Sequence, residues 1–186
     1  VFDLIRGKVV FSSSMITDFV LIRANGMPTY NFACAVDDHL MNISHVIRAS
    51  EHLNNTLKQL MIYEAMEVTP PKYAHISLIL GPDREKLSKR HGATSVGQFK
   101  DDGYLPEALL NYLALLGWSS PKKDQEIISL DEMKELFSLK RINNAPAIFD
   151  KAKLNWMNGL YLRKKSLDNL KKDLYPFLNG YKFTVV

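Results

Sequence analysis

A serine between two lysines gives the clearest chemical signal in the sequence. The stretch Lys86-Leu87-Ser88-Lys89-Arg90 carries this pattern, and Gly81 and Gly92 flank it. An ammonium group is a compact point charge that suits phosphate, and a serine hydroxyl can donate a hydrogen bond to a phosphate oxygen. The pattern predicts a mobile loop that grips phosphate. An exposed basic turn carries the same residue types and is the alternative interpretation.

The elements before this loop predict where it lies. Residues 43–48 read as a short buried strand, residues 54–65 as a helix that Pro70-Pro71 ends, and residues 76–80 as a second strand. Strand, helix, strand is the order of a crossover unit in a parallel sheet. Ligands bind at the carboxyl ends of such strands, and the basic stretch follows the carboxyl end of the second strand.

Two further patterns fill the first hundred residues. Residues 18–23 and 29–36 are rich in strand formers, with the tight-turn pair Asn25-Gly26 between them, so we expect a hairpin. In the helix predicted over 54–65, helical spacing points one set of apolar residues inward. These are Leu57, Leu60, Met61 and Ala65.

Beyond residue 100 the pattern becomes helical. Pro106 suits a first helical position, and Ser129 and Glu132 have the spacing of a capping box. Further helices are predicted from about Lys151 and from Ser166. The sequence thus predicts an α/β part over residues 1–100 and an all-α bundle over residues 101–186.

Composition narrows the class of protein. With 186 residues, 46% of them hydrophobic, the chain can bury a core, and its single cysteine, Cys34, excludes an internal disulfide. No stretch approaches the roughly 20 apolar residues that span a bilayer, so no membrane partner is expected. The net charge of +4 is compatible with RNA. Lysine pairs on solvated helix faces would give the same surplus.

Several stretches, all in one order along the chain, resemble glutamyl-tRNA synthetase, a class I aminoacyl-tRNA synthetase. The basic stretch at 86–90 is similar to the K-M-S-K-S loop of that class, in the form found in glutamyl enzymes. The other stretches are 18–23, 28–32, 36–39, 43–48, 80–84, 91–96, 103–108, 111–118 and 149–159. The resemblance extends over about Asp3 to Arg163 and rests on the whole series, not on a single motif.

The resemblance implies roles for particular residues. Lys89 and, secondarily, Lys86 would hold ATP phosphates while glutamate attacks the α-phosphate, and Ser88 would shape the loop. Tyr30 and Arg48 correspond to the amino-acid pocket. The residues that correspond to the ATP site are Glu51, His52, Lys86, Leu87, Ser88, Lys89 and Arg90.

Each pocket role has a structural alternative. Tyr30 could be a core aromatic residue on a strand, and Arg48 could form an ion pair with Asp37 or Asp38. Glu51 and His52 could be the polar start of a helix. ATP is expected as a substrate together with Mg²⁺, and no protein-bound metal is predicted in the chain.

The chain also departs from the family pattern. It has no H-I-G-H segment, which belongs to the first half of the active site, and residues 1–11 resemble only the tail of the acceptor-binding insertion. We therefore expect a fragment with the second half of a Rossmann-like catalytic fold over residues 1–100. A helical stem-contact domain and the start of the anticodon-binding helices would follow over residues 101–186. The fragment by itself is expected to be inactive.

The function implied for the parent protein is glutamate–tRNA ligase. It would activate L-glutamate with ATP and transfer it to the 3′ end of tRNA(Glu), with tRNA(Gln) left open, as a monomer in a bacterial cytoplasm or an organelle. A glutamyl-queuosine tRNA synthetase paralogue is one alternative, and a glutaminyl enzyme is less favoured because helices follow the loop. A non-catalytic RNA-binding or regulatory module derived from a synthetase is another.

Overall fold

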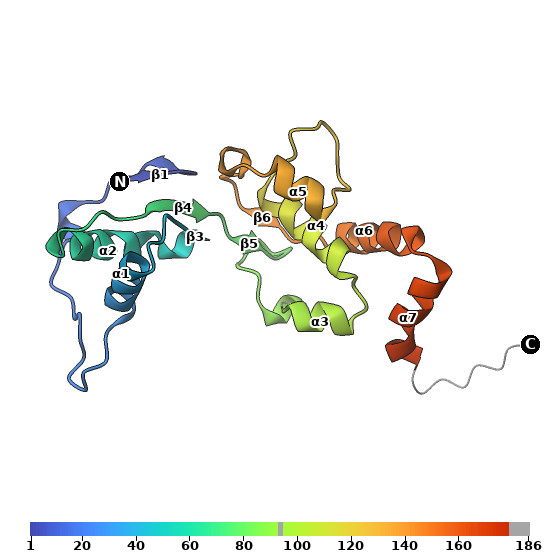
Figure 1. Ribbon diagram of the computed structural model, residues 1–186, viewed down its shortest axis with the longest axis horizontal. Helices are drawn as coiled ribbons and strands as arrows, with labels where there is room; N and C mark the ends of the chain where they lie inside the picture. The colour runs from blue at the N-terminus through green and yellow to red at the C-terminus, as the bar shows by residue number, and fades with distance from the viewer. Residues whose placement is uncertain (93–94, 179–186) are drawn as a thin grey trace, which may run out of the picture. The chain divides into compact units, whose positions relative to one another are not determined.

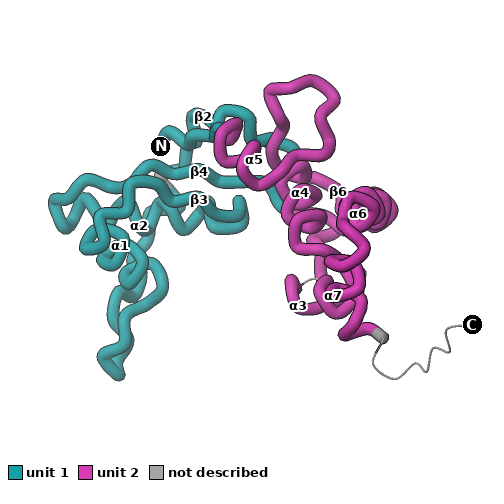
Figure 2. The backbone as a smooth tube through the Cα atoms, turned by 45° about the vertical axis from the view of Figure 1, so that its right-hand side comes forward, with its two compact units in different colours: residues 1–78, 138–146 teal, residues 79–137, 147–186 magenta. Residues whose placement is uncertain are grey.

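The computed structural model describes residues 1–92 and 95–178, which form two compact units (Figure 2). Unit 1 consists of residues 1–78 and 138–146, and unit 2 of residues 79–137 and those from 147 onward. Each unit has its own core. The division into domains of residues 1–100 and 101–186 stays a prediction.

Unit 1 is built on a mixed four-stranded sheet with the order β2-β1-β4-β3. Strands β1 (Phe2–Asp3) and β3 (His45–Ala49) both run parallel to the central β4 (Lys72–Ile76), and β2 (Gly7–Lys8) pairs with β1 in the antiparallel sense. Helix α2 (Leu53–Ala65) joins β3 to β4 (Figure 1). The predicted parallel crossover is therefore confirmed, although its second strand begins earlier than residue 76.

The second half of the predicted hairpin is wrong. Residues Tyr30–Leu40 form helix α1, not a strand. The Asn25-Gly26 turn does exist, since the amide of Arg23 donates to the carbonyl of Met27 at 2.8 Å and Gly26 has a φ of +82°. Pairing stops after the single bridge between Ile22 and Pro28. A helix is favoured over a strand here because helical spacing places Phe32 and Ala35 against the core residues Ile62 and Tyr63 of α2.

The strand predicted over residues 76–80 is also wrong in its bounds. The chain leaves β4 after Ile76, and Ile79–Leu80 forms the separate strand β5, which pairs with β6 (Ala147–Ile148). The prediction followed the apolar residues at 76–80. The buried part of β4 comes earlier and consists of Tyr73, Ala74 and His75. A histidine can occupy this core because it is hydrogen-bonded there.

Helix α2 faces the sheet with a different side from the one predicted. Its buried residues are Thr56, Gln59, Ile62 and Tyr63. By contrast, Leu57, Leu60 and Met61 are half-buried and Ala65 is exposed. Thr56 and Gln59 are buried because they hydrogen-bond, to Arg48 at 2.8 Å and to Asn31 at 3.4 Å. Thr56 and Gln59 are thus buried at positions that the spacing of apolar residues alone would predict to be exposed to solvent.

The helices of unit 2 follow the predicted starts. Helix α4 (Pro106–Gly117) has Pro106 in its first turn, and the capping box of Ser129 and Glu132 opens α5 (Leu130–Leu136). Helix α6 is Lys151–Lys164, α7 is Leu167–Leu178, and the short α3 is Val96–Asp101. Short 3-10 turns, η1 (Ser13–Met15), η2 (Ser50–His52), η3 (Lys89–His91) and η4 (Leu139–Arg141), complete the elements of the described residues.

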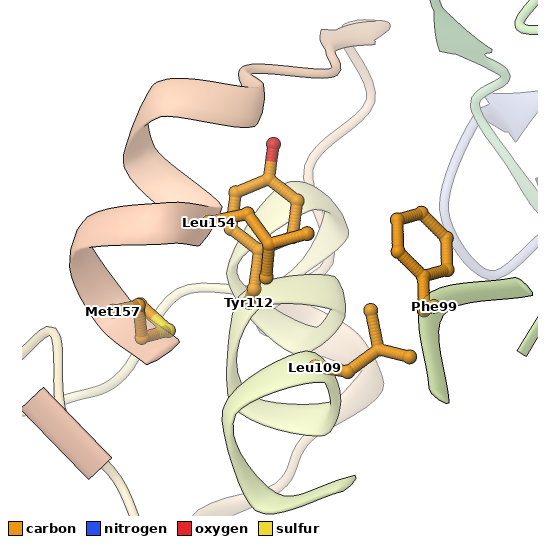
Figure 3. Packing of buried hydrophobic residues seen from close by; sticks show 5 residues of the cluster. All are labelled: Phe99, Leu109, Tyr112, Leu154 and Met157. Atoms are coloured by element: carbon orange, nitrogen blue, oxygen red, sulfur yellow. The ribbon is translucent and has the colours of Figure 1, made fainter. Parts of the chain in front are cut away.

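The core of unit 2 gathers side chains from α3, α4 and α6. Its buried members are Phe99, Leu109, Tyr112, Leu154 and Met157, which Figure 3 shows together. Tyr112 also accepts a hydrogen bond at its hydroxyl from the amide of Asp150, at 2.6 Å. This contact fixes the start of α6 against α4, and β5, which leads into the basic stretch, belongs to the same unit.

Candidate functional site

Arg48 lies in the middle of β3, directly opposite His75 in the parallel register with β4. Its Nε–H donates to Nε2 of His75 at 3.0 Å, and its Nη2 donates to Oγ1 of Thr56 at 2.8 Å. The guanidinium carbon lies 5.4 Å from the ring centroid of Tyr73. Arg48 is half-buried, so a substrate can still reach it.

The ion pair between Arg48 and Asp37 or Asp38 is not present within residues 1–92 and 95–178, where Arg48 bonds to His75 and Thr56 instead. Asp38 is nonetheless close enough for the charge of Arg48 to affect its pKa. Burial raises the pKa of Asp38, and Arg48 acts against that rise. The charged end of Arg48 is therefore available for a carboxylate that this part of the chain does not supply.

Tyr30 is the first residue of α1 and is 52% exposed, so it is not a core aromatic residue on a strand. Its ring centroid lies 6.0 Å from that of His52. Burial raises the pKa of Tyr30, with Cys34 in the same direction and Arg48 against it. Unit 1 thus brings Tyr30 close to both His52 and Arg48, and their roles in substrate binding stay a prediction.

Glu51 and His52 form part of the 3-10 turn η2, immediately before α2. His52 is the residue preceding the first turn of α2, and its Nε2 lies 3.9 Å from Oε1 of Glu51. This position fits the polar start of a helix. Their role in binding adenosine stays a prediction.

The basic stretch belongs to unit 2, where a tight turn ties its first half to β5. The amide of Gly81 donates to the carbonyl of Glu85 at 2.8 Å, and the amide of Leu87 donates to the carbonyl of Ile79 at 3.0 Å. Lys86 pairs with Leu80 through an antiparallel bridge. The stretch is therefore anchored at its start.

The imidazole of His91 holds the second half of the loop. The amide of Ser88 donates to its Nδ1 at 3.0 Å, and its Nε2 lies 3.0 Å from Oδ2 of Asp83. Since Nδ1 accepts, Nε2 carries the proton and donates to the carboxylate. That hydrogen bond is the main reason why the pKa of Asp83 is lowered. Arg90 also donates to Asp83, through Nη2 at 2.9 Å, and Lys89 at the start of the same turn is exposed.

Gly81→Ala is expected to displace His91 from this position. A Cβ at Gly81 would lie 2.8 Å from Cε1 and Nε2 of the His91 ring, closer than real contacts allow. Losing the hydrogen bond from Ser88 should raise amide exchange at Ser88 by roughly 10-fold, as measured by hydrogen–deuterium exchange.

The matched control is Gly117→Ala, where a Cβ meets no atom within 4 Å. His91→Ala should reproduce the faster exchange, and adding Gly81→Ala to it should change nothing further, because both act through one contact. An unchanged Ser88 exchange rate in Gly81→Ala would show that His91 does not hold the loop.

The lysines on α6 and α7, and Lys165 between these helices, divide into those that form an ion pair and those that do not. Lys153 pairs with Glu126 at 2.6 Å, and Lys165 pairs with Asp173 at 2.6 Å, so these two charges are partly neutralised within the chain. Lys151, Lys171 and Lys172 are exposed on α6 and α7. These three, like the exposed Arg163 and Lys164, form no ion pair in the described part of the chain and present positive charge to an anionic partner.

No helix within residues 1–92 and 95–178 combines the length and apolar character that crossing a membrane requires. The same residues contain no group of three or more histidine, cysteine or acidic side chains that could hold a metal ion.

The class that this fold and site define is that of the class I tRNA synthetases. The family model "tRNA synthetases class I (E and Q), catalytic domain" matches residues 1–156, and the chain belongs to this family. The chain is 57% identical over 178 residues to a glutamate–tRNA ligase of Moorella thermoacetica, and 56% identical over 181 residues to glutamate–tRNA ligase 1 of Pseudothermotoga lettingae. These alignments cover 96% and 97% of the chain but 36% and 38% of the relatives.

Solved structures agree with the sequence comparison. A glutamate tRNA ligase from Elizabethkingia meningosepticum, crystallised in complex with its amino acid, superposes with a TM-score of 0.88 at 38% identity. The glutamate-tRNA synthetase of Elizabethkingia anophelis gives 0.90 at 37% identity. Both cover 99% of this chain, and the chain covers 40% and 41% of theirs. The predicted fold, α/β followed by helices, and the resemblance to glutamyl-tRNA synthetase are confirmed.

Three residues of the hydrogen-bonded group around Arg48 were not singled out from the sequence. They are Asp3, Thr56 and His75, and they come from β1, α2 and β4. His75 directly precedes the strand predicted over residues 76–80, and a polar residue at that edge is only a weak signal for such a role. Nothing in the sequence pairs Asp3 with a residue 72 positions away.

Proposed function

We propose that this chain supplies part of the active site of a glutamate–tRNA ligase. The observation that carries the proposal is the 57% identity to such a ligase over 96% of the chain. Because the chain spans 36% of that relative, the activity is proposed for a protein of the relative's full length that contains this chain. We call that protein the extended protein.

The first step is the activation of glutamate. A carboxylate oxygen of L-glutamate attacks the α-phosphorus of ATP, and the bond from that phosphorus to the bridging oxygen breaks. The products are glutamyl-adenylate and pyrophosphate. Lys89 and Lys86 stabilise the charge that moves onto the departing phosphates, with Ser88 shaping the loop. Magnesium arrives with ATP, whose phosphate oxygens are its natural ligands.

In unit 1, Arg48 and Tyr30 serve the amino acid. A guanidinium pairs with a carboxylate through two parallel hydrogen bonds, and glutamate carries two carboxylates. His52, whose ring lies near that of Tyr30, and its neighbour Glu51 are assigned to the adenosine part of ATP. The observations that support these assignments are the fixed side chain of Arg48 and the ring contact between Tyr30 and His52.

In the second step the terminal ribose hydroxyl of tRNA attacks the glutamyl carbonyl, and AMP leaves. The exposed lysines of α6 and α7 would contact the tRNA backbone, which makes that binding sensitive to salt. We assign tRNA(Glu) as the acceptor and leave tRNA(Gln) as a further candidate. The extended protein is proposed to act as a monomer in a bacterial cytoplasm or an organelle.

Glutamate-dependent ATP–pyrophosphate exchange, with cognate tRNA present, tests this function. The extended protein is compared with the chain by itself, and exchange is expected from the extended protein. Exchange that needs glutamine or another amino acid instead would contradict the proposal. No exchange at all would favour a non-catalytic module, and exchange by the chain alone would contradict the expectation that half of the site lies outside it.

A further inference from the structure

We propose that Asp3 and His75 are positioning residues that aim Arg48 at the substrate carboxylate. The inference rests on the proposed function, because it concerns how the assigned glutamate-binding residue is held. It stands on three hydrogen-bonded side chains that come from three adjacent strands of one sheet, β1, β4 and β3.

The carboxylate of Asp3 is completely fixed. The side chain is 1% exposed, and its Oδ1 accepts hydrogen bonds from the amides of Ile5 and Arg6, both at 2.9 Å. Its Oδ2 accepts from the backbone amide of His75 at 3.1 Å and lies 2.7 Å from Nδ1 of that residue. Burial raises the pKa of Asp3, but these hydrogen bonds outweigh it and lower the pKa overall. Asp3 is therefore a buried anion.

A buried carboxylate beside Nδ1 decides the tautomer of His75. The imidazole is inaccessible to solvent, and its Nδ1–H must donate because the Asp3 carboxylate can only accept. Nε2 is then left as an acceptor, which is what the Nε–H of Arg48 requires. Burial lowers the pKa of His75 and the charge of Arg48 acts in the same direction, and together they outweigh Asp3, which raises it, so the ring stays neutral at pH 7.

The consequence falls on the free end of Arg48. A guanidinium has five N–H groups. In Arg48 the N–H on Nε donates to His75, and one N–H on Nη2 donates to Thr56. Of the two on Nη1 and the second on Nη2, none meets a carboxylate in the described part of the chain, although Arg48 also interacts with the neutral hydroxyl of Tyr30 through a hydrogen bond that acts against the rise in the pKa of Tyr30. Those three belong to the end of the guanidinium that binds a carboxylate in the bidentate manner. Tyr73 lies against the flat face at 5.4 Å, so the side chain is held from its edge and its face.

An arginine with a purely structural role would be expected to meet a carboxylate directly. Here the nearest buried anion, Asp3, is separated from Arg48 by the neutral ring of His75. The charge of Arg48 is thus oriented by a hydrogen-bonded chain and is not cancelled by contact. This arrangement leaves attraction for a carboxylate that arrives from outside.

The tautomer itself can be measured in the extended protein without any substitution. Long-range ¹H–¹⁵N spectra of the histidine rings distinguish a protonated Nδ1 from a protonated Nε2. We expect His75 to carry its proton on Nδ1 at pH 7. A proton on Nε2 would overturn the inference, because that nitrogen could not accept from Arg48.

Variants of the extended protein test the consequence for glutamate. Asp3→Asn keeps the volume of the side chain but places an amide donor near the ring, so the acceptor for Arg48 is lost. We expect the KM for glutamate in the exchange assay to rise about 10-fold or more, with the KM for ATP changed less than about twofold. A merely structural role would lower the folded fraction without separating these two constants.

A second pair of variants covers the case in which Asp3→Asn fails to fold. His75→Gln can keep an acceptor for Arg48, whereas His75→Leu cannot, so the KM for glutamate should rise with leucine and much less with glutamine. Arg48→Ala sets the full scale of the effect. If the unaltered protein shows no glutamate-dependent exchange, the proposed function fails. If exchange is normal and Asp3→Asn and His75→Leu leave the KM for glutamate unchanged, only this inference fails.

Discussion

Replacing Lys89 with alanine in the extended protein is expected to slow glutamate-dependent ATP–pyrophosphate exchange by roughly 100- to 1,000-fold. The reason is that charge moves onto the leaving phosphates in the transition state, where a fixed ammonium stabilises it more than in bound ATP. The KM for ATP should therefore change much less than the rate. Lys89 opens the 3-10 turn η3 and is exposed, in a loop that hydrogen bonds to His91 and Asp83 hold in shape.

Lys123→Ala is the matched control, since it removes another exposed lysine of unit 2 that lies outside the basic stretch. It should exchange at the unaltered rate. Lys89→Arg separates charge from shape, because arginine keeps the charge but spreads it over a planar group. A rate for Lys89→Ala within about twofold of the unaltered protein would remove Lys89 from the proposed chemistry.

Leu154→Ala is expected to lower the free energy of unfolding of unit 2 by about 2–5 kcal/mol. Leu154 is completely buried and packs between α4 and α6 with Tyr112 and Met157 (Figure 3). Truncation removes buried methyl groups and leaves a cavity that the two helices can fill only in part. Urea unfolding followed by tryptophan fluorescence measures the effect, because both tryptophans, Trp118 and Trp156, belong to unit 2.

The control for this prediction is Leu167→Ala. The substitution is again leucine to alanine, but Leu167, at the start of α7, is 75% exposed. The free energy of unfolding of the Leu167→Ala variant should stay within about 0.5 kcal/mol of the value for the unaltered protein. Equal effects of the two substitutions would mean that the cluster around Leu154 is not the stabilising core of unit 2.

Local signals in the sequence were sufficient for much of the fold. Helix α4 begins at Pro106 and α5 at the capping box of Ser129, because proline and a capping serine act on their own first turn. The basic stretch at 86–90 was also evident, since its residues are neighbours in the chain. The series of family-like stretches also led to the prediction that Tyr30 and Arg48 line the amino-acid pocket.

Errors arose where a short apolar pattern suits both helix and strand. Residues 29–36 alternate poorly and contain alanines, and only the packing of Phe32 and Ala35 against α2 decides for helix α1. In the same way the burial of Tyr73 to His75 fixes β4 before residue 76, which an apolar count alone cannot predict. Both choices depend on partners far away in the sequence.

The sequence by itself determined the family, the basic loop and the starts of the later helices, because these depend on residue types at short, fixed spacings. Only the tertiary structure decided how Arg48 is held. Asp3 and His75 are 72 residues apart and meet because β1 pairs with β4, and Arg48 meets His75 because β3 pairs with β4. A hydrogen bond between side chains of different strands requires the sheet to exist, so neither the tautomer of His75 nor the direction of Arg48 can be obtained from spacing along the chain.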